Sequence, residues 1–178
     1  MAGARLKALW DRDRTLIRFL FTGVGGYALW YALYEGVLRP FTLLDEVVIA
    51  GLVRGTCMLG ELFGAQMRVG EGAWPTQVGV VGQAGVTIGT PCDGVVLFAL
   101  FTVFVAAFPG SWKHKLWFVP AGIAVLFGVN LGRVVALTFI QAHAPKLLQF
   151  NHDYTFTVLV YGVVLGLWYV YVTQPKLR

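Results

Sequence analysis

One stretch divides the chain: Thr87-Ile88-Gly89-Thr90-Pro91-Cys92-Asp93-Gly94-Val95 ends a polar, glycine-rich segment and opens a long apolar run. Pro91 is typical of a helix start, and Asp93 or Thr90 can cap such a helix. The free N–H groups and positive dipole end of a helix start favour the thiolate form of a cysteine. The sequence therefore predicts a reactive thiol, Cys92, where a membrane helix enters from water. The alternative is an ordinary small packing residue at a helix start.

The composition is typical of a polytopic membrane protein. Of the 178 residues, 57% are hydrophobic and only 13% are charged, whereas soluble domains carry about 25% charged residues. The mean hydropathy is +0.69. We attribute the net charge of +5 to orientation in the membrane rather than to nucleic-acid binding. We expect residues 1–178 to form a single integral membrane domain.

Apolar runs predict four membrane spans, at about 16–38, 92–108, 116–141 and 153–172. Residues 41–69 have apolar positions at helical spacing with charges between them, a pattern typical of a helix lying on the membrane. Alternation in 77–82 and 85–88 predicts a β-hairpin. The predicted fold class is an all-α polytopic membrane protein with about four transmembrane helices, an outer-face amphipathic helix and a short β-hairpin, the last two within residues 41–90.

Basic residues indicate how the spans are oriented. With four spans, the two tails and the loop at 111–115 share one side, which the positive-inside rule assigns to the cytoplasm. If residues 41–69 crossed the membrane as well, that loop and the C-terminal tail would lie outside. We therefore expect a multi-pass protein of the inner (cytoplasmic) membrane, with the amphipathic helix, the hairpin and Cys92 on the outer, periplasmic face. The basic residues of the cytoplasmic side are Arg5, Lys7, Arg12, Arg14, Lys113, Lys115, Lys176 and Arg178.

Two more candidate residues lie near the outer ends of predicted spans. Arg133 is about eight residues inside a span, or roughly 12 Å deep at 1.5 Å per residue, and a charge at such depth marks function by default. The alternative is a structural ion pair with Asp93 or Glu35. Asn130 shares the helix face of Arg133. His152 precedes the last span, so topology gathers a thiol, a cation and an imidazole, the parts that cysteine acyl transfer needs.

Other polar residues give weaker hypotheses. His143 lies on the same outer loop as His152 and is the alternative base. A disulfide between Cys57 and Cys92 is conceivable in an oxidising compartment. His and Cys residues lack the spacing of a metal site, so we expect neither a metal nor a cofactor.

Three short motifs resemble those of the exosortase/archaeosortase family: Cys92 in Pro-Cys-Asp-Gly, Asn130-Leu-Gly-Arg133, and His152-Asp153. The resemblance extends over roughly residues 45–172. It implies a polytopic membrane cysteine transpeptidase with Cys92 as nucleophile, Arg133 as oxyanion stabiliser and His152 as acid/base. Asp93 stands where the family commonly has Ser, and the usual Gly shortly after the His is missing.

The resemblance also implies a function. We expect a thiol protease that cleaves the C-terminal sorting signals of exported proteins and transfers them to an acceptor. Its partners would be exported proteins with a C-terminal motif, a transmembrane helix and a basic tail, together with the lipid bilayer and no nucleic acid. The alternative is a non-enzymatic membrane protein, such as a small transporter subunit or an assembly scaffold, with Arg133 as a structural or substrate-site charge. A transporter needs Arg133 but not Cys92, whereas the enzyme needs both.

Overall fold

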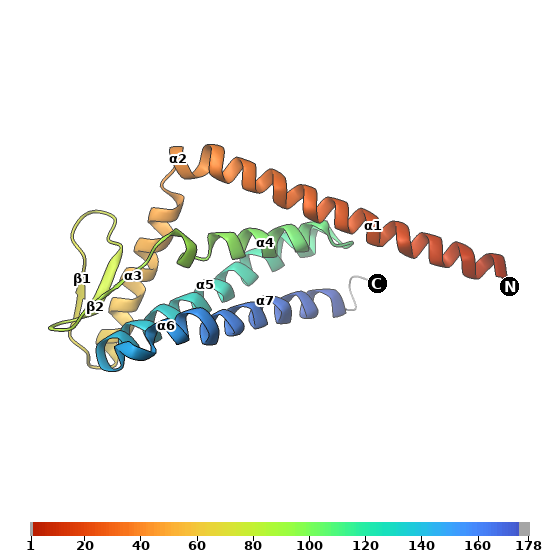
Figure 1. Cartoon of the computed structure of the whole chain (residues 1–178). Helices are drawn as coiled ribbons and strands as arrows, with labels where there is room; N and C mark the ends of the chain where they lie inside the picture. Colours follow the sequence, from red (N-terminus) through yellow and green to blue (C-terminus); the bar gives the residue numbers. More distant parts are fainter. Residues whose placement is uncertain (1, 175–178) are drawn as a thin grey trace.

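The computed structural model describes the backbone of residues 2–174 and the side chains of Arg14 and residues 16–174 other than Pro91. It is mostly helical, with one small antiparallel sheet (Figure 1). Helical stretches long and apolar enough to cross a membrane are Leu16–Phe41, Trp112–His143 and Pro145–Thr173. A further apolar helix, Val95–Ala107, is shorter, about 20 Å at 1.5 Å per residue. The chain is an all-α polytopic membrane protein, as predicted.

The first helix forms one arm of the molecule. Helix α1 (Ala2–Leu33) continues through a π-helical turn (Tyr34–Leu38) into α2 (Arg39–Phe41). It packs along α4 (Val95–Ala107) through Phe19, whose ring meets the rings of Phe104 and Phe108 edge-on. Towards α2 the two helices diverge (Figure 1).

Three helices pack against one another: α4, α5 (Trp112–His143) and α7 (Phe156–Thr173). A Cβ at Gly122 of α5 would overlap the ring of Phe101 on α4, so glycine permits the close approach of these two helices. Apolar burial and aromatic packing stabilise the contact between these helices. We call the buried cluster that they form the bundle core. Its buried members are Phe101, Val105, Phe118, Leu126, Val164 and Tyr171.

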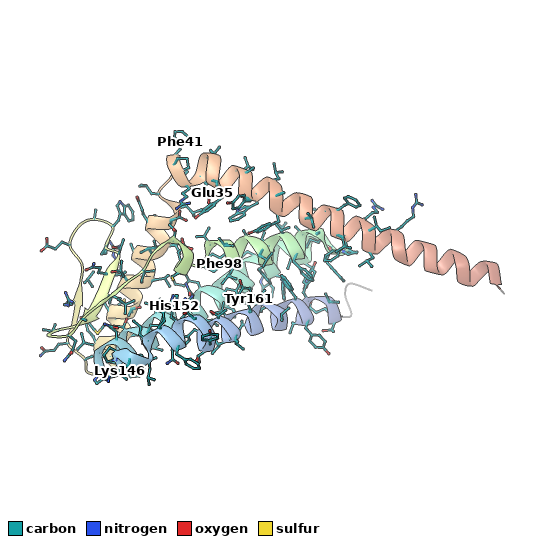
Figure 2. The ribbon with its side chains drawn as sticks, viewed as in Figure 1. Glu35, Phe41, Phe98, Lys146, His152 and Tyr161 are labelled. Atoms are coloured by element: carbon teal, nitrogen blue, oxygen red, sulfur yellow. The ribbon has the colours of Figure 1, made fainter. Side chains whose placement is uncertain are left out.

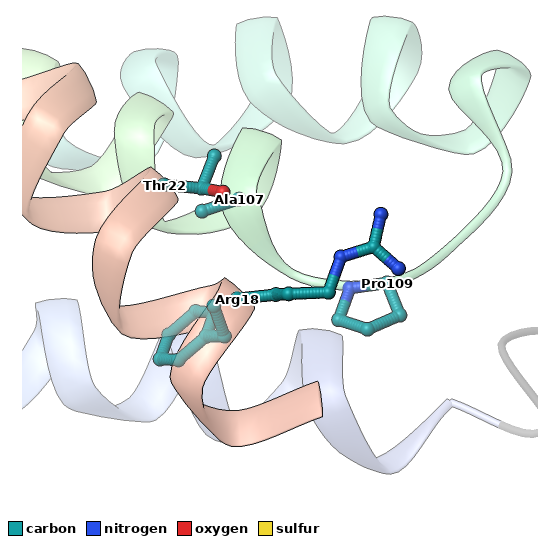
Figure 3. A pocket seen from close by; sticks show the side chains of 5 residues that line it. Arg18, Thr22, Ala107 and Pro109 are labelled. Atoms are coloured by element: carbon teal, nitrogen blue, oxygen red, sulfur yellow. The ribbon is translucent and has the colours of Figure 1, made fainter. Parts of the chain in front are cut away.

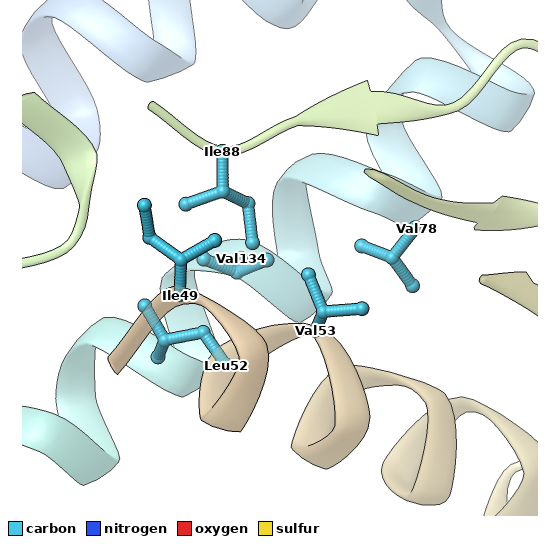
Figure 4. Packing of buried hydrophobic residues seen from close by; sticks show 6 residues of the cluster. All are labelled: Ile49, Leu52, Val53, Val78, Ile88 and Val134. Atoms are coloured by element: carbon cyan, nitrogen blue, oxygen red, sulfur yellow. The ribbon is translucent and has the colours of Figure 1, made fainter. Parts of the chain in front are cut away.

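A second core lies between α3 (Leu44–Leu62) and a three-stranded sheet (Figure 4). The strands are β1 (Met67–Val69), β2 (Gln77–Val80) and β3 (Val86–Thr87), antiparallel in the order β1-β2-β3. This second core, the sheet core, consists of Ile49, Leu52, Val53, Val78, Ile88 and Val134.

The predicted hairpin is present as β2 and β3, but the helix expected within residues 41–69 is shorter than predicted and a third strand follows it. The helix ends at Leu62 because Gly64 adopts φ +82°. The Gly64 N–H bonds to the Glu61 carbonyl and the Ala65 N–H to the Gly60 carbonyl, the pattern of a Schellman helix end. After Gly64 the chain leaves the helix and forms β1, which adds a third strand to the predicted hairpin.

The two ends of the molecule differ. The sheet, α3 and the bend between α6 (Leu148–Phe150) and α7 lie at one end, which we call the sheet end. The α4–α5 connection and the end of α7 lie at the other, the terminal end (Figure 1). A cavity of about 420 Å³ opens at the terminal end, between Arg18 and Thr22 of α1 and Ala107 and Pro109 (Figure 3). Its described lining residues include neither cysteine nor histidine.

Candidate active site

A tight turn carries Cys92 from the sheet into α4. Thr90–Cys92 forms a single 3-10 turn, and Gly94 follows with φ +90°, a conformation that favours glycine. Helix α4 begins at Val95, whose N–H donates to Asp93 Oδ1 at 2.9 Å. The apolar helix that the sequence predicts from Cys92 therefore begins later, at Val95, and Cys92 precedes its first turn because Gly94 interrupts the helical backbone.

Asn130 of α5 is hydrogen-bonded to this turn. Its side chain is buried, and Nδ2 donates to the backbone carbonyls of Cys92 at 2.9 Å and Asp93 at 3.0 Å. Because both acceptors belong to the turn, this one amide restrains the position of Cys92 relative to α5. Cys92 also packs against the sheet core.

The side chains of Cys92, Arg133 and His152 meet at one point. Cys92 Sγ lies 3.3 Å from His152 Nε2, and Arg133 Nη2 lies 3.7 Å from the same sulfur. They come from three elements: the turn before α4, the middle of α5 and the bend before α7. The structure thus brings together the three residues that the sequence singled out, although 41 and 60 positions separate the thiol from the other two.

His152 is oriented by its neighbour in sequence. Residues Asn151–Thr155 form a π-helical turn, and His152 Nδ1 lies 2.9 Å from Asp153 Oδ1 (Figure 2 labels His152). Gln149 donates to the other oxygen of Asp153. When Nδ1–H donates to Asp153, Nε2 presents its lone pair to the Cys92 thiol. This arrangement is the acid/base tautomer that a cysteine nucleophile needs.

A family model described as transmembrane exosortase (Exosortase_EpsH) matches residues 71–170. The chain belongs to the transmembrane exosortase family. The matched region contains β2, β3, the Cys92 turn, α4, α5 and the His152 bend, whereas α1 and α3 precede it. No curated protein and no solved structure matches the chain. The family and the apolar helices support a multi-pass membrane protein of exosortase-like function.

The alternative partners of Arg133 in this exosortase-family chain are engaged elsewhere. Asp93 caps Val95, and Glu35 forms an ion pair with Arg39 at 3.0 Å. Among the described side chains, the contact of the Arg133 guanidinium is the Cys92 sulfur, and its Nε is buried without a hydrogen-bond partner. Among the described residues, Arg133 therefore forms no ion pair with Asp93 or Glu35, the alternative that the sequence suggested.

Two weaker candidates also lie apart from this contact. Cys57 and Cys92 are both free, and the Cys57 thiol contacts Glu61 of its own helix. The disulfide hypothesis is therefore wrong for this structure. His143 Nδ1 lies 3.0 Å from the Phe139 carbonyl of its own helix, whereas His152 reaches the sulfur.

Sequence reasoning gave no site role to Asp153 and did not single out Asp45. Side chains of consecutive residues on a regular α-helix do not face each other, so the π-helical turn is what lets Asp153 reach His152. Asp45 is 8% exposed and lies beside Asp93, which is 1% exposed. Its position in an amphipathic helix gave no sign of burial, because the first turn of a helix commonly carries exposed acids.

Proposed function

We propose that the chain is a membrane cysteine peptidase and transpeptidase that cleaves C-terminal sorting signals of exported proteins and transfers them to an acceptor. The observation that carries the proposal is the 3.3 Å contact between Cys92 Sγ and His152 Nε2 beside the Arg133 guanidinium. Membership of the transmembrane exosortase family adds support.

In the first step His152 Nε2 takes the Cys92 proton, and the thiolate attacks the carbonyl carbon of the scissile peptide bond. The carbonyl oxygen becomes an oxyanion, which the Arg133 guanidinium, already 3.7 Å from the sulfur, stabilises. Collapse of the tetrahedral intermediate breaks the C–N bond. The imidazolium gives its proton to the leaving amine, and a thioester joins the substrate to Cys92.

In the second step an acceptor nucleophile or water attacks the thioester and gives its proton to His152. The C–S bond breaks, and the thiolate recovers a proton from the imidazolium. Asp153 serves both steps by holding the imidazole through Nδ1. Side-chain exposures of 41% for His152 and 42% for Asp153 leave the acid/base accessible to an incoming acceptor.

The sheet end is proposed to face the periplasm. The first half of α1, which carries Arg14 and Arg18, and the start of α5, which carries Lys113 and Lys115, lie at the terminal end, opposite the sheet. By the positive-inside rule this charge partition puts the terminal end in the cytoplasm. A site on the outer face would meet exported proteins after they cross the membrane.

The substrate is proposed to be anchored by a transmembrane helix with a basic cytoplasmic end. An anchor confines the scissile bond to the depth of Cys92, which makes the encounter nearly intramolecular. The motif reader would be the sheet. Strand β3 is an edge strand in the described sheet, and an edge can pair with an extended peptide. It also leads directly into the Cys92 turn.

The proposal is tested with the purified protein in lipid and a membrane-anchored substrate. Cys92→Ala, Cys92→Ser and His152→Ala should abolish processing at unchanged protein level, whereas Cys57→Ala should process normally as the matched thiol control. A soluble peptide with the same motif but no anchor should be a far poorer substrate. Full activity of Cys92→Ala would end the nucleophile assignment, and equal turnover of the two substrates would end the argument for membrane confinement.

A further inference from the structure

Two carboxyl groups are buried side by side behind the Cys92 turn. Asp93 is 1% exposed and Asp45, in the first turn of α3, is 8% exposed. The Asp45 carboxyl lies close enough to Asp93 to raise its pKa. Tyr34, in the π-helical turn after α1, donates its hydroxyl to Asp45 Oδ1 at 2.9 Å. The three side chains join α1, α3 and the turn that carries the thiol.

One oxygen atom of this pair has no hydrogen-bond donor. Asp93 Oδ1 accepts the Val95 N–H, and Asp93 Oδ2 is buried without a hydrogen-bond donor. Two ionised carboxylates offer only acceptors, and burying adjacent negative charges is costly. Carboxyl groups that share a buried site therefore hold one proton between them, as a pair.

The surroundings favour the proton on Asp93. Asp45 lies at the positive end of the α3 dipole and accepts the Tyr34 hydroxyl, and both contacts stabilise its anion. Asp93 precedes α4 and lies outside the spanning helices. Burial, followed by the proximity of Asp45, raises the pKa of Asp93 to about 7.

No described cation neutralises the pair. Glu35 and Arg39, on the turn that carries Tyr34, bond to each other at the surface. Arg133 of α5 and His152 of the α7 bend are directed at Cys92 Sγ. The contact that α5 makes with Asp93 is the uncharged Asn130 amide on the Asp93 carbonyl.

We propose that Asp45 and Asp93 share one proton, and that the hydrogen-bonded link Tyr34–Asp45–Asp93 holds the Cys92 turn in place. Asp93 is thus a positioning residue that acts through Cys92. Loss of the shared proton leaves two adjacent buried anions, which repel each other and loosen the turn. Only the effect on processing rests on the proposed function; the shared proton itself does not.

Infrared spectroscopy of the full-length protein in lipid tests the shared proton without any substrate. The wild type at about pH 5.5 should show the C=O stretch of a protonated carboxylic acid, which disappears by about pH 8.5 as the pair ionises. Asp93→Asn should remove the band, whereas Asp45→Asn, which takes away the neighbouring carboxylate, should make the band disappear at a lower pH. Glu46→Gln, which changes an exposed carboxylate of the same helical turn, should keep it. Absence of the band in the wild type, or its persistence in Asp93→Asn, would overturn the proposal.

Processing of an anchored substrate tests the positioning role. An Asn at 93 can accept the Val95 N–H through Oδ1 and donate to Asp45 through Nδ2, so it mimics the protonated acid at every pH. Asp93→Asn should process at least about tenfold faster than Asp93→Ala, a difference of about 1.4 kcal/mol. It should also lack the wild-type decline in rate between about pH 6 and 8. Equal rates in the two variants, or an unchanged pH profile in Asp93→Asn, would refute the positioning role. The infrared band in a wild type that processes nothing would support the shared proton and refute the enzyme.

Discussion

Near Cys92 the helices are joined by directed hydrogen bonds, whereas the bundle core is joined mainly by apolar packing. At the sheet end, Asn130 bonds to two backbone carbonyls and Asp93 caps Val95. In the bundle core, the rings of Phe104 and Trp168 stack at 4.1 Å and Phe118 packs on Tyr171 at 5.0 Å. A hydrogen bond restrains the distance and angle between particular atoms. Apolar packing instead fills the available space with side chains and has no such direction. The difference explains why irregular backbone gathers where a reactive atom must be placed.

Substitutions in the two regions test this difference. Substitutions at the sheet end should change chemistry or its pH dependence while the chain still folds. Substitutions in the bundle core should change the amount of folded protein but not the activity of each folded molecule.

The two ends should lie on opposite sides of the membrane, an all-or-none difference. We would place a single cysteine at Gln83→Cys, in the exposed β2–β3 turn, or at Lys113→Cys, exposed at the terminal end, in a Cys57→Ala/Cys92→Ala background. An impermeant maleimide should label position 83 but not 113 in intact cells, because positive residues keep the terminal end inside. Both should label after permeabilisation. Labelling of position 113 in intact cells would reverse the orientation and remove the periplasmic site.

The second prediction concerns Arg133, the cation of the sheet end. Arg133→Lys should lower the processing rate by about 10²–10³, the usual cost of losing one oxyanion donor. A lysine keeps the charge but loses the planar fork that can hold an oxyanion from two nitrogens. Rate measurements on equal amounts of folded protein check this. A loss below about threefold, far short of that range, would show that charge alone suffices.

The sequence predicted the bundle better than the sheet end. Apolar runs of twenty residues have few alternatives in a bilayer, so the long helices follow from composition. The start of α4 was missed because Pro91 and Asp93 both favour a helix start, while Gly94, between them and Val95, sets the left-handed turn that delays it. Strand β1 was missed because its pairing with β2 is a tertiary contact.

Cys92, Arg133 and His152 could be predicted as a group because each residue type is unusual near a helix end in the membrane. Topology then placed them on one side. Asp45 and Asp153 could not be assigned in this way, since an acid in a first turn or beside a His is common at exposed positions. Their contacts depend on how α3 packs and on the π-helical turn at Asn151–Thr155.

The third prediction concerns Gly122 in the bundle core. Gly122→Ala should destabilise the protein by about 1–3 kcal/mol, because its new Cβ would overlap the fully buried ring of Phe101. The folded fraction should keep its specific activity. Gly128→Ala is the matched control, since a Cβ there meets nothing within 4 Å. Thermal unfolding in detergent and activity per folded molecule measure the two effects, and equal stability of both variants would contradict the packing argument.

The fourth prediction is a pH dependence confined to the sheet end. Burial raises the pKa of Asp93 from 3.8 to about 7, so between these values the folded chain binds more protons than the unfolded one. Stability from this group is therefore complete below about pH 4 and is lost as the pH rises through about 7. Each kcal/mol lost lowers the unfolding temperature by about 2–4 °C in a chain of this size. Asp93→Asn should flatten that decline, whereas Glu46→Gln and Gly122→Ala should retain it, the latter from a lower starting temperature. A decline of equal slope in Asp93→Asn would mean that the pH dependence arises elsewhere, and the sheet end would then differ from the bundle core in geometry but not in its response to protons.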